Sequence, residues 1–347
     1  MRKGFFLHGI PTGIIILALM VVFSGCTDIT YNFETPEPPA QADQFEVVRV
    51  ALDGYLSSNP APVILAGDLF DNLNDDDTSN DPVIISVRPN DLYQVGHIPG
   101  AINISWKEIA FNSSLAKIPA GKDVVVYCNT GHTAGVATTI LNALGYNAKN
   151  LKFGICAWTQ EADVLDGNCF DAITDAHSYP LETTANTLPA TQPLNAINNT
   201  TSVDEFEIIR ASAEAYAAGS QPAVMLAEDL NENLNDGDDT NDPLIISVRK
   251  AEHYNLGHIP GAVNIPWTSS AKVSELTKLP VDAEIVVVCY TGHTSAIATT
   301  VLNMLGYDAV NLKFGMCGWT MDTDVIATDC FSIAIANDFP VNSGPNP

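Results

Sequence analysis

Cysteine is the residue type whose placement in this chain most clearly indicates chemistry. Cys128 opens the segment CNTGHTA, and Cys289 opens the segment CYTGHTS 161 residues later. Backbone N–H groups and the positive end of a helix dipole stabilise a thiolate that lies between a strand and a helix. The pattern therefore predicts two nucleophilic cysteines, with two buried structural cysteines as the alternative. The β-branched runs before the cysteines are residues 124–127 and 285–288, and the helical stretches after them are residues 134–144 and 295–305.

The residues that follow each cysteine are expected to form a cradle of backbone N–H groups for an anion. Glycine at the fourth position of each loop allows the chain to curl. Neither loop contains Lys or Arg, so the loop histidines are its only candidate cations, and a pKa of roughly 6.5 leaves them mostly neutral at pH 7. We therefore expect weak binding of a dianion. The predicted cradle consists of Asn129, Thr130, Gly131, His132 and Thr133 in the first loop, and of Tyr290, Thr291, Gly292, His293 and Thr294 in the second.

The elements that position these loops occur twice, because the chain is a duplication with a period of 161 residues. GHIPGA begins at Gly96 and at Gly257, and LKFG begins at Leu151 and at Leu312. Short apolar runs, at 83–87 and 244–248 among others, alternate with helical segments, of which 45–56 and 206–217 are the first in each copy. Alternating strands and helices predict an α/β fold in which each copy has a parallel sheet with helices on both faces.

Three motifs, each present in both copies, resemble those of the rhodanese family. An apolar strand that ends in Ser-Val-Arg precedes GHIPGA, the six-residue loop Cys-x-x-Gly-x-Thr follows, and a Gly-x-x-x-Trp segment comes after the next strand. The resemblance covers both copies nearly end to end and implies two tandem rhodanese-like domains. The motifs lie at residues 86–88, 128–133 and 154–158, and at residues 247–249, 289–294 and 315–319.

The resemblance implies that the chain is a sulfurtransferase enzyme. Cys128 or Cys289 would attack the sulfane sulfur of a donor such as thiosulfate or a persulfide, or a similar chalcogen species, and hold the sulfur as a cysteine persulfide. A thiol acceptor would then remove it, and no cofactor beyond the persulfide is implied. The alternative is a catalytically weak binding or scaffold protein that docks envelope redox or electron-transfer proteins.

The sequence departs from the family pattern just before the arginine of the first motif. Ser86 and Ser247 stand where rhodanese relatives usually have Asp, so the ion pair with that Asp is absent. We interpret Arg88 and Arg249 as structural, because they sit at strand ends. Cysteine phosphatases of similar fold carry an arginine six residues after the cysteine, where this chain has Ala or Ser, and this excludes phosphate chemistry of that kind.

Four further cysteines form two equivalent pairs after the last strand of each copy. The chain has seven cysteines. If Cys26 carries a lipid, as argued below, and Cys128 and Cys289 are nucleophiles, the remaining four form two disulfides and no cysteine is left unassigned. The predicted bridges are Cys156–Cys169 and Cys317–Cys330. A zinc site is disfavoured because the nearby sequence supplies no further pair of ligands. A second alternative makes Cys156 a resolving thiol for Cys128.

The N-terminus predicts a lipoprotein leader. Arg2 and Lys3 precede an apolar stretch at 12–23, which runs into Ser-Gly and Cys26. Small residues before a cysteine resemble a bacterial lipobox, so we expect acyl groups on Cys26 to hold the protein in a lipid bilayer. Thr27 in place of Asp favours the bacterial outer membrane, facing the periplasm or the surface. Ordinary secretion is the alternative.

Charge and acidic segments indicate which other ligands or partners the chain could bind. The formal charge of −26, with 41 acidic and 15 basic residues, argues against nucleic acid as a partner. Two acidic segments, NDDDTSND and NDGDDTND, offer weak calcium candidates at Asp75, Asp77, Asp81, Asp236, Asp238 and Asp242, although solvated loops are the default interpretation. The expected organisation is a signal peptide (1–25), a tether (26–43), a first domain (44–180), a linker (181–203), a second domain (204–341) and a tail (342–347).

Overall fold

The β-branched runs of the sequence form two parallel five-stranded sheets in the computed structural model. The structure describes residues 43–58, 62–188, 191–220, 223–326 and 330–346, so the predicted signal peptide, Cys26 and nearly all of the predicted tether lie outside it. The first sheet has the order β1 (Val63–Ile64), β5 (Ala148–Leu151), β4 (Val124–Tyr127), β2 (Val83–Ser86) and β3 (Ile102–Asn103). The second has the order β6 (Val224–Met225), β10 (Asp308–Leu312), β9 (Glu284–Val288), β7 (Leu244–Ser247) and β8 (Val263–Asn264).

Every strand pair in both sheets is parallel, which confirms the predicted α/β architecture. Helices flank each sheet. In the first repeat they are α1 (Gln44–Ser58), α2 (Ala66–Leu73), α3 (Asn90–Val95), η1 (Trp106–Glu108), α4 (Asn112–Leu115), α5 (His132–Ala143), α6 (Gly154–Trp158) and α7 (Ala162–Leu165). In the second they are α8 (Glu205–Ala218), α9 (Ala227–Asn233), α10 (Ala251–Tyr254), η2 (Trp267–Ser269), α11 (Val273–Leu276), α12 (His293–Met304), α13 (Gly315–Trp319), α14 (Thr323–Ile326) and η3 (Ile333–Ile335).

The helix after each cysteine loop begins two residues earlier than the sequence predicts. Gly131 and Gly292 have φ angles of 91° and 88°, a left-handed conformation that side chains with a Cβ rarely adopt. Each glycine completes the turn by itself, so the helix starts directly at His132 or His293. The loop is consequently shorter and tighter than its sequence suggests.

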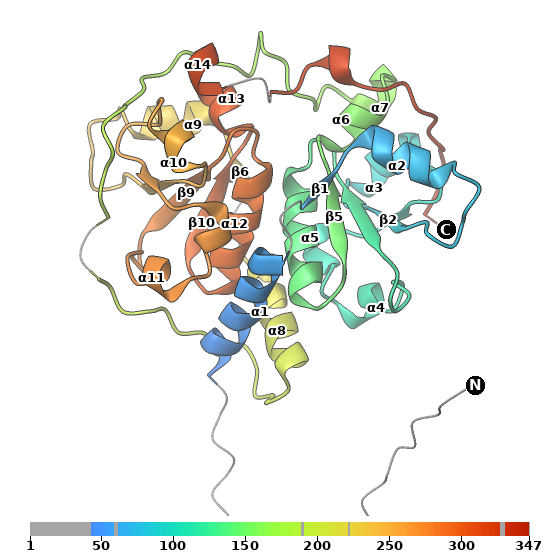
Figure 1. Cartoon of the computed structure of the whole chain (residues 1–347), viewed down its shortest axis with the longest axis horizontal. Coiled ribbons are helices and arrows are strands. Elements are labelled where there is room, and N and C mark those ends of the chain that lie inside the picture. The colour runs from blue at the N-terminus through green and yellow to red at the C-terminus, as the bar shows by residue number, and fades with distance from the viewer. Residues whose placement is uncertain (1–42, 59–61, 189–190, 221–222, 327–329, 347) are drawn as a thin grey trace, which may run out of the picture. The chain divides into compact units, whose positions relative to one another are not determined.

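One hydrophobic core joins the two repeats. It contains buried residues from α1, α5, α8 and α12 and from the facing sides of both sheets. Figure 1 shows these four helices between the sheets, and α5 lies against α12 while α1 lies against α8. The described residues of both repeats accordingly form one compact unit, in which the two predicted domains share this core.

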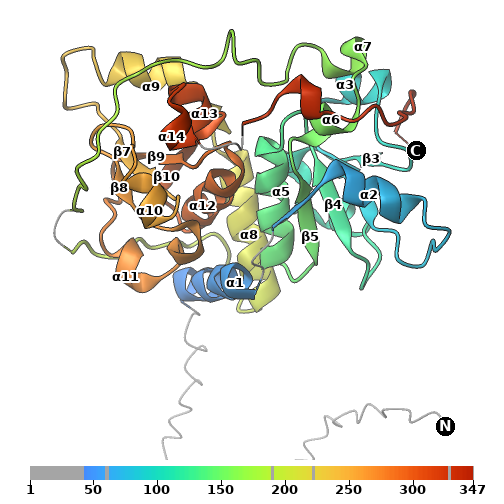
Figure 2. The ribbon, with the colours of Figure 1, turned by 45° about the horizontal axis from the view of Figure 1, so that its top comes forward.

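The segment after the last helix of each repeat docks on the opposite repeat. Downstream of α7, the N–H groups of His177 and Tyr179 donate to carbonyls of α13, and Glu182 pairs with His258 in the second repeat. Downstream of η3, the equivalent N–H groups of Asn337 and Phe339 donate to carbonyls of α6. Figure 2 shows both crossings, with the C-terminus beside β3. Each repeat is therefore covered in part by a segment that follows the last helix of the other repeat.

The predicted linker also lies on the second repeat rather than spanning a gap. Gln192 donates its backbone N–H to Thr277, and the side chain of Asn195 donates to Gly306. Leu188, Leu194 and Ile197 pack against the shared core. Within the described residues, no helix combines the length and apolarity needed to cross a membrane.

Candidate functional site

Cys128 lies at the carboxyl end of β4, the central strand of its sheet, directly before the loop that opens α5. Cys128 is 5% exposed, and its Sγ accepts a hydrogen bond of 3.0 Å from the backbone N–H of Gly131. Cys289 has the equivalent place after β9 and is 3% exposed. Its Sγ accepts a hydrogen bond of 3.1 Å from the backbone N–H of Gly292. Each sulfur therefore lies inside the curl of its own loop, where N–H groups stabilise negative charge.

The backbone of each loop is fixed from behind by the short helix that follows the next strand. The N–H groups of Ile155 and Cys156 donate to the carbonyls of Cys128 and Asn129 at 2.9 and 3.2 Å. Met316 and Cys317 make the same two bonds in the second repeat. These bonds hold the loop backbone in place, and the N–H of Gly131 or Gly292 is the loop N–H that bonds to the sulfur.

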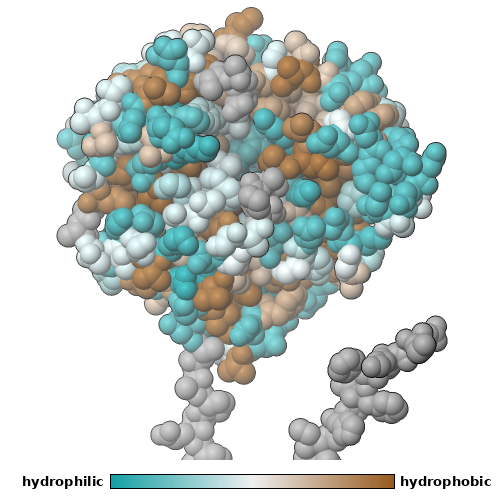
Figure 3. Space-filling view, in the orientation of Figure 1, coloured by the Kyte–Doolittle hydropathy of each residue, from teal (hydrophilic) through white to brown (hydrophobic). Residues whose placement is uncertain are grey.

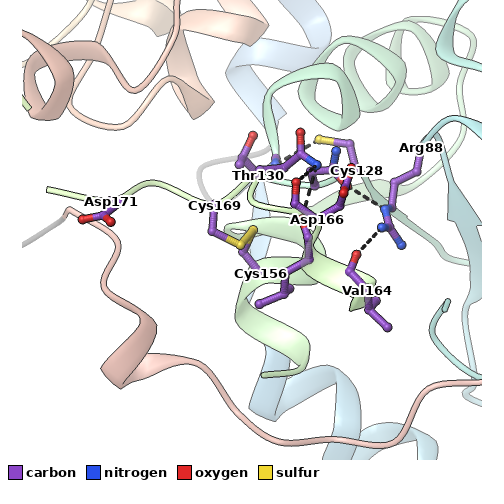
Figure 4. The surroundings of a disulfide bond; sticks show 12 residues. Arg88, Cys128, Thr130, Cys156, Val164, Asp166, Cys169 and Asp171 are labelled. Atoms are coloured by element: carbon purple, nitrogen blue, oxygen red, sulfur yellow. Dashed lines mark hydrogen bonds between the residues drawn. A yellow bond between two sulfur atoms is a disulfide. The ribbon is translucent and has the colours of Figure 1, made fainter. Parts of the chain in front are cut away.

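Two disulfides hold these short helices, and they join the cysteines that the sequence pairs. Cys156 is bonded to Cys169, and Cys317 is bonded to Cys330. Figure 4 shows the first bridge next to the loop that carries Cys128 and Thr130. Cys156 therefore has no free thiol in this structure, whereas Cys128 and Cys289 are unpaired.

The loop histidines bond to the opposite repeat through Nε2, which corrects their interpretation as candidate cations. The Nε2 atom of His132 accepts a hydrogen bond of 3.1 Å from the backbone N–H of Phe314. The Nε2 atom of His293 accepts one of 3.0 Å from the backbone N–H of Phe153. Burial, which disfavours the charged form, lowers the pKa of each histidine from 6.5 to about 3. Both rings are neutral at pH 7. The sequence could not show this, because each acceptor bond crosses to the other repeat.

The neutral imidazoles are held by threonines of the predicted cradle. Because Nε2 is an acceptor, Nδ1 carries the proton and donates to the hydroxyl of Thr130 at 2.6 Å, or of Thr291 at 2.8 Å. Within the cradle, the side chains of these threonines and histidines therefore serve the contact between repeats. Thr133 and Thr294 are half-buried in the first turns of α5 and α12.

Arg88 and Arg249 support the loops from inside the protein. Arg88 is 2% exposed and donates to the carbonyls of Gly96 and Val164 and to Oδ1 of Asn129, at 2.6, 2.5 and 2.6 Å. Arg249 donates to Gly257 and lies 5.1 Å from the ring centroid of Tyr290. Burial lowers the pKa of both guanidinium groups. Each arginine thus positions the residue that follows the nucleophile.

An open hollow of about 630 Å³ lies beside Cys128. Asn129, Thr130, His132 and Thr133 line one side of it, and Trp106 contributes to another. Val224 and Lys313 of the second repeat also line this hollow, and the sequence alone gives no signal that they belong there.

A second cavity, where the two loops meet, is too small for a substrate. It holds only about 10 Å³, at the lower limit of the volume that one water molecule requires. Its lining consists of four pairs of equivalent residues, Thr130 and Thr291, Phe153 and Phe314, Cys156 and Cys317, and Phe170 and Phe331. The two cysteine loops therefore meet about an approximate two-fold axis.

The acidic segments form exposed turns after α2 and α9. Asp75 and Asp77 accept N–H groups two residues downstream, and Asp236 and Asp238 do the same. The first of these turns lies within the hydrophilic surface at the right of Figure 3. In the part of the chain that is described, no group of three or more His, Cys, Asp or Glu residues could hold a metal ion.

Comparison with known proteins identifies the repeats. A model of the rhodanese-like domain matches residues 66–161 and 226–322. An HTH-type transcriptional regulator of Mycobacterium tuberculosis is 31% identical over 125 residues, 33% of this chain and 53% of the regulator. The thiosulfate sulfurtransferase PspE of Escherichia coli is 42% identical over 72 residues, 20% of this chain and 69% of PspE. The crystal structure of a thiosulfate sulfurtransferase from Pseudomonas aeruginosa has 17% identity and a TM-score of 0.29, over 88% of this chain and 49% of that one.

Proposed function

Because this chain belongs to the rhodanese-like domain family, we propose that it transfers sulfane sulfur through persulfides on Cys128 and Cys289. The cysteine thiolate attacks the outer sulfur of the donor, the sulfur–sulfur or sulfur–sulfonate bond breaks, and the leaving group departs with the electron pair. Thiosulfate would release sulfite, and a persulfide would release a thiolate. An acceptor thiolate then attacks the outer sulfur of the cysteine persulfide, which regenerates the cysteine thiolate.

The observation that carries this proposal is the N–H bond from Gly131 to the sulfur of Cys128, repeated by Gly292 and Cys289. An N–H group that already points at the reacting sulfur costs little reorganisation during reaction. The hollow beside Cys128 gives a donor access to the first loop. The family match and the sulfurtransferase among the relatives support the same chemistry.

The proposal also places the protein in the bacterial envelope. The apolar stretch at 12–23 and the Ser-Gly pair before Cys26 support cleavage and lipidation at that cysteine. The two disulfides agree with an oxidising compartment. Metabolic labelling with a fatty acid tests this part: the wild type should take up label, and Cys26→Ser should not.

Intact-mass measurement after incubation with thiosulfate or a polysulfide tests the chemistry. We expect up to two added sulfur atoms, removable by dithiothreitol, and one at most in Cys128→Ser or in Cys289→Ser. Retention of sulfur loading in the double variant would overturn the assignment of the nucleophiles. Absence of loading in the wild type with every donor would favour the scaffold function instead.

A further inference from the structure

The hollow beside Cys128 is completed by the second repeat. Lys313 lines it together with Cys128 and Thr133, although β10, which ends just before this lysine, belongs to the other sheet. Lys313 is half-buried, and its Nζ lies 4.7 Å from the ring centroid of Phe314. The side chain is therefore held at the contact between the repeats and is not free in solvent.

Hydrogen bonds on both sides of the two-fold axis fix this arrangement. The residue after Lys313 donates its N–H to His132 in the first cysteine loop. Equivalently, the residue after Lys152 donates to His293 in the second loop, and Nζ of Lys152 lies 5.1 Å from the ring centroid of Phe153. Each lysine is thus one residue away from a bond to the cysteine loop of the opposite repeat. The charges reach those loops as well, because Lys313 and Lys152 contribute to the lowered pKa of His132 and His293 respectively.

Among the described residues that line the hollow beside Cys128, Lys313 is the half-buried cation, and Lys152 has the equivalent position in the other repeat. Neither makes an ion pair with any described residue, although the chain carries 41 acidic side chains. The loop histidines are neutral, and the arginine behind each loop is buried and bonded to backbone carbonyls. A half-buried ammonium group without a carboxylate partner binds an anion more strongly than a solvated one does.

We propose that each cysteine site takes its anion-binding cation from the other repeat, with Lys313 serving Cys128 and Lys152 serving Cys289. The lysines would select sulfur donors that carry an anionic group next to the sulfane sulfur, of which thiosulfate is the simplest. This inference rests on the proposed sulfurtransfer. It also replaces the expectation, based on the loop sequences alone, that a dianionic donor finds no cation there.

Single-site proteins provide the test, because each reports on one cysteine. In the Cys289→Ser protein, loading of Cys128 is followed by mass spectrometry against thiosulfate concentration. Lys313→Gln should raise the half-saturating thiosulfate concentration about tenfold, because one charge-assisted hydrogen bond is lost. Lys313→Arg should restore most of the affinity. In the Cys128→Ser protein, Lys152→Gln should have the same effect on Cys289. Dimethyl trisulfide is a neutral electrophile: the thiolate attacks its terminal sulfur, and methyl persulfide anion leaves. It should add a methylthio group to each cysteine equally well with and without its lysine.

Lys117→Gln serves as the control, because it removes the same charge from an exposed position. It should leave the thiosulfate dependence of both single-site proteins within about twofold, since exposed distant charges are screened. An effect of Lys313→Gln on Cys289 rather than Cys128 would overturn the proposed assignment across repeats. Equal losses with thiosulfate and with the trisulfide would show a structural role for the lysine. If thiosulfate and a polysulfide both fail to add sulfur to the unaltered single-site proteins, the proposed function itself is wrong.

Discussion

His132 accepts a hydrogen bond from the backbone N–H of Phe314, a residue 182 positions further along the chain. His293 and Phe153 form the equivalent bond in the opposite direction, and the centroids of the two imidazole rings are 6.0 Å apart. These bonds require neutral acceptor nitrogens, so each histidine must remain deprotonated for the two cysteine loops to stay together. The contact between the repeats is consequently sensitive to acid.

Acid should therefore destabilise the protein through these histidines. Their folded pKa of about 3 lies below the ordinary 6.5, so the unfolded chain binds more protons between these values. The stabilisation is complete above pH 6.5 and is lost as the pH falls toward 3, with a slope of up to about 1.4 kcal/mol per pH unit for each histidine. Denaturant unfolding of the wild type and of His132→Gln/His293→Gln from pH 7 to 4 measures it. Parallel curves for the two proteins would contradict this prediction.

A serine introduced after the first cysteine loop should stabilise the protein. The hydroxyl of Ser295 donates to Oδ1 of Asn311 at 2.6 Å, but Ala134 holds the equivalent place and leaves Oδ1 of Asn150 buried without a partner. Ala134→Ser should raise the free energy of unfolding by about 1 kcal/mol, and Ser295→Ala should lower it by about 1–3 kcal/mol. Urea denaturation checks both values. A destabilising Ala134→Ser would show that the first repeat lacks room for the hydroxyl.

Loss of one aromatic side chain from the C-terminal segment should weaken the first repeat. The ring of Phe339 stacks on Phe70 at 4.0 Å between centroids and meets the edge of Trp158 at 5.1 Å. Phe339→Ala should lower the free energy of unfolding by about 2–3 kcal/mol, which is at or below the usual range for a buried phenylalanine because this ring is only half-buried. Ile335→Ala, in the same segment but 58% exposed, should change it by less than about 0.5 kcal/mol.

The same variants test whether the repeats unfold together. Since the docked segments and the core link them, the melting curve of Phe339→Ala should shift as one transition. Calorimetry distinguishes this result from two separated peaks, which would indicate independent repeats.

Removal of the first disulfide should cost stability without ending sulfur loading. Cys156 and Cys169 are 13 positions apart, so Cys156→Ala/Cys169→Ala should lower the free energy of unfolding by about 3 kcal/mol. Loading of Cys128 at 25 °C should persist, because the backbone bonds from Ile155 and Cys156 to the loop remain. Abolished turnover in a fully folded double variant would support Cys156 as the resolving thiol.

Local patterns predicted the parts of the structure that depend on local physics. The run VVVY before Cys128 forms a strand with the predicted bounds, because four adjacent apolar, mainly β-branched residues fit the buried centre of a parallel sheet. The tight loop after Cys128 follows from a glycine at the position where the backbone turns left-handed. Disulfide partners also lie within one repeat, close enough in sequence to be paired by their spacing.

The role of the loop histidines could not be predicted in this way. Nothing in CNTGHTA indicates that the imidazole would turn toward a backbone N–H in the other repeat. The exchange of the segments after Phe170 and Phe331 was equally hidden, although the repeat period slips by one residue there. Lys313 was overlooked as a site residue for the same reason, since the hollow that it lines belongs to a cysteine in the other half of the chain.

The exchange of the two docked segments bears on how such a chain originates. A single repeat would lack three things that the other repeat supplies here. These are the docked segment that bonds to α6 or α13, the N–H partner of the loop histidine, and the lysine beside the cysteine. Two copies related by a two-fold axis would supply all three to each other, as subunits do in an isologous homodimer. A chain that carries both copies holds these exchanged contacts within one polypeptide, so its two halves are free to differ. Asn129 against Tyr290, and Ala134 against Ser295, are differences that a homodimer of identical subunits could not have acquired.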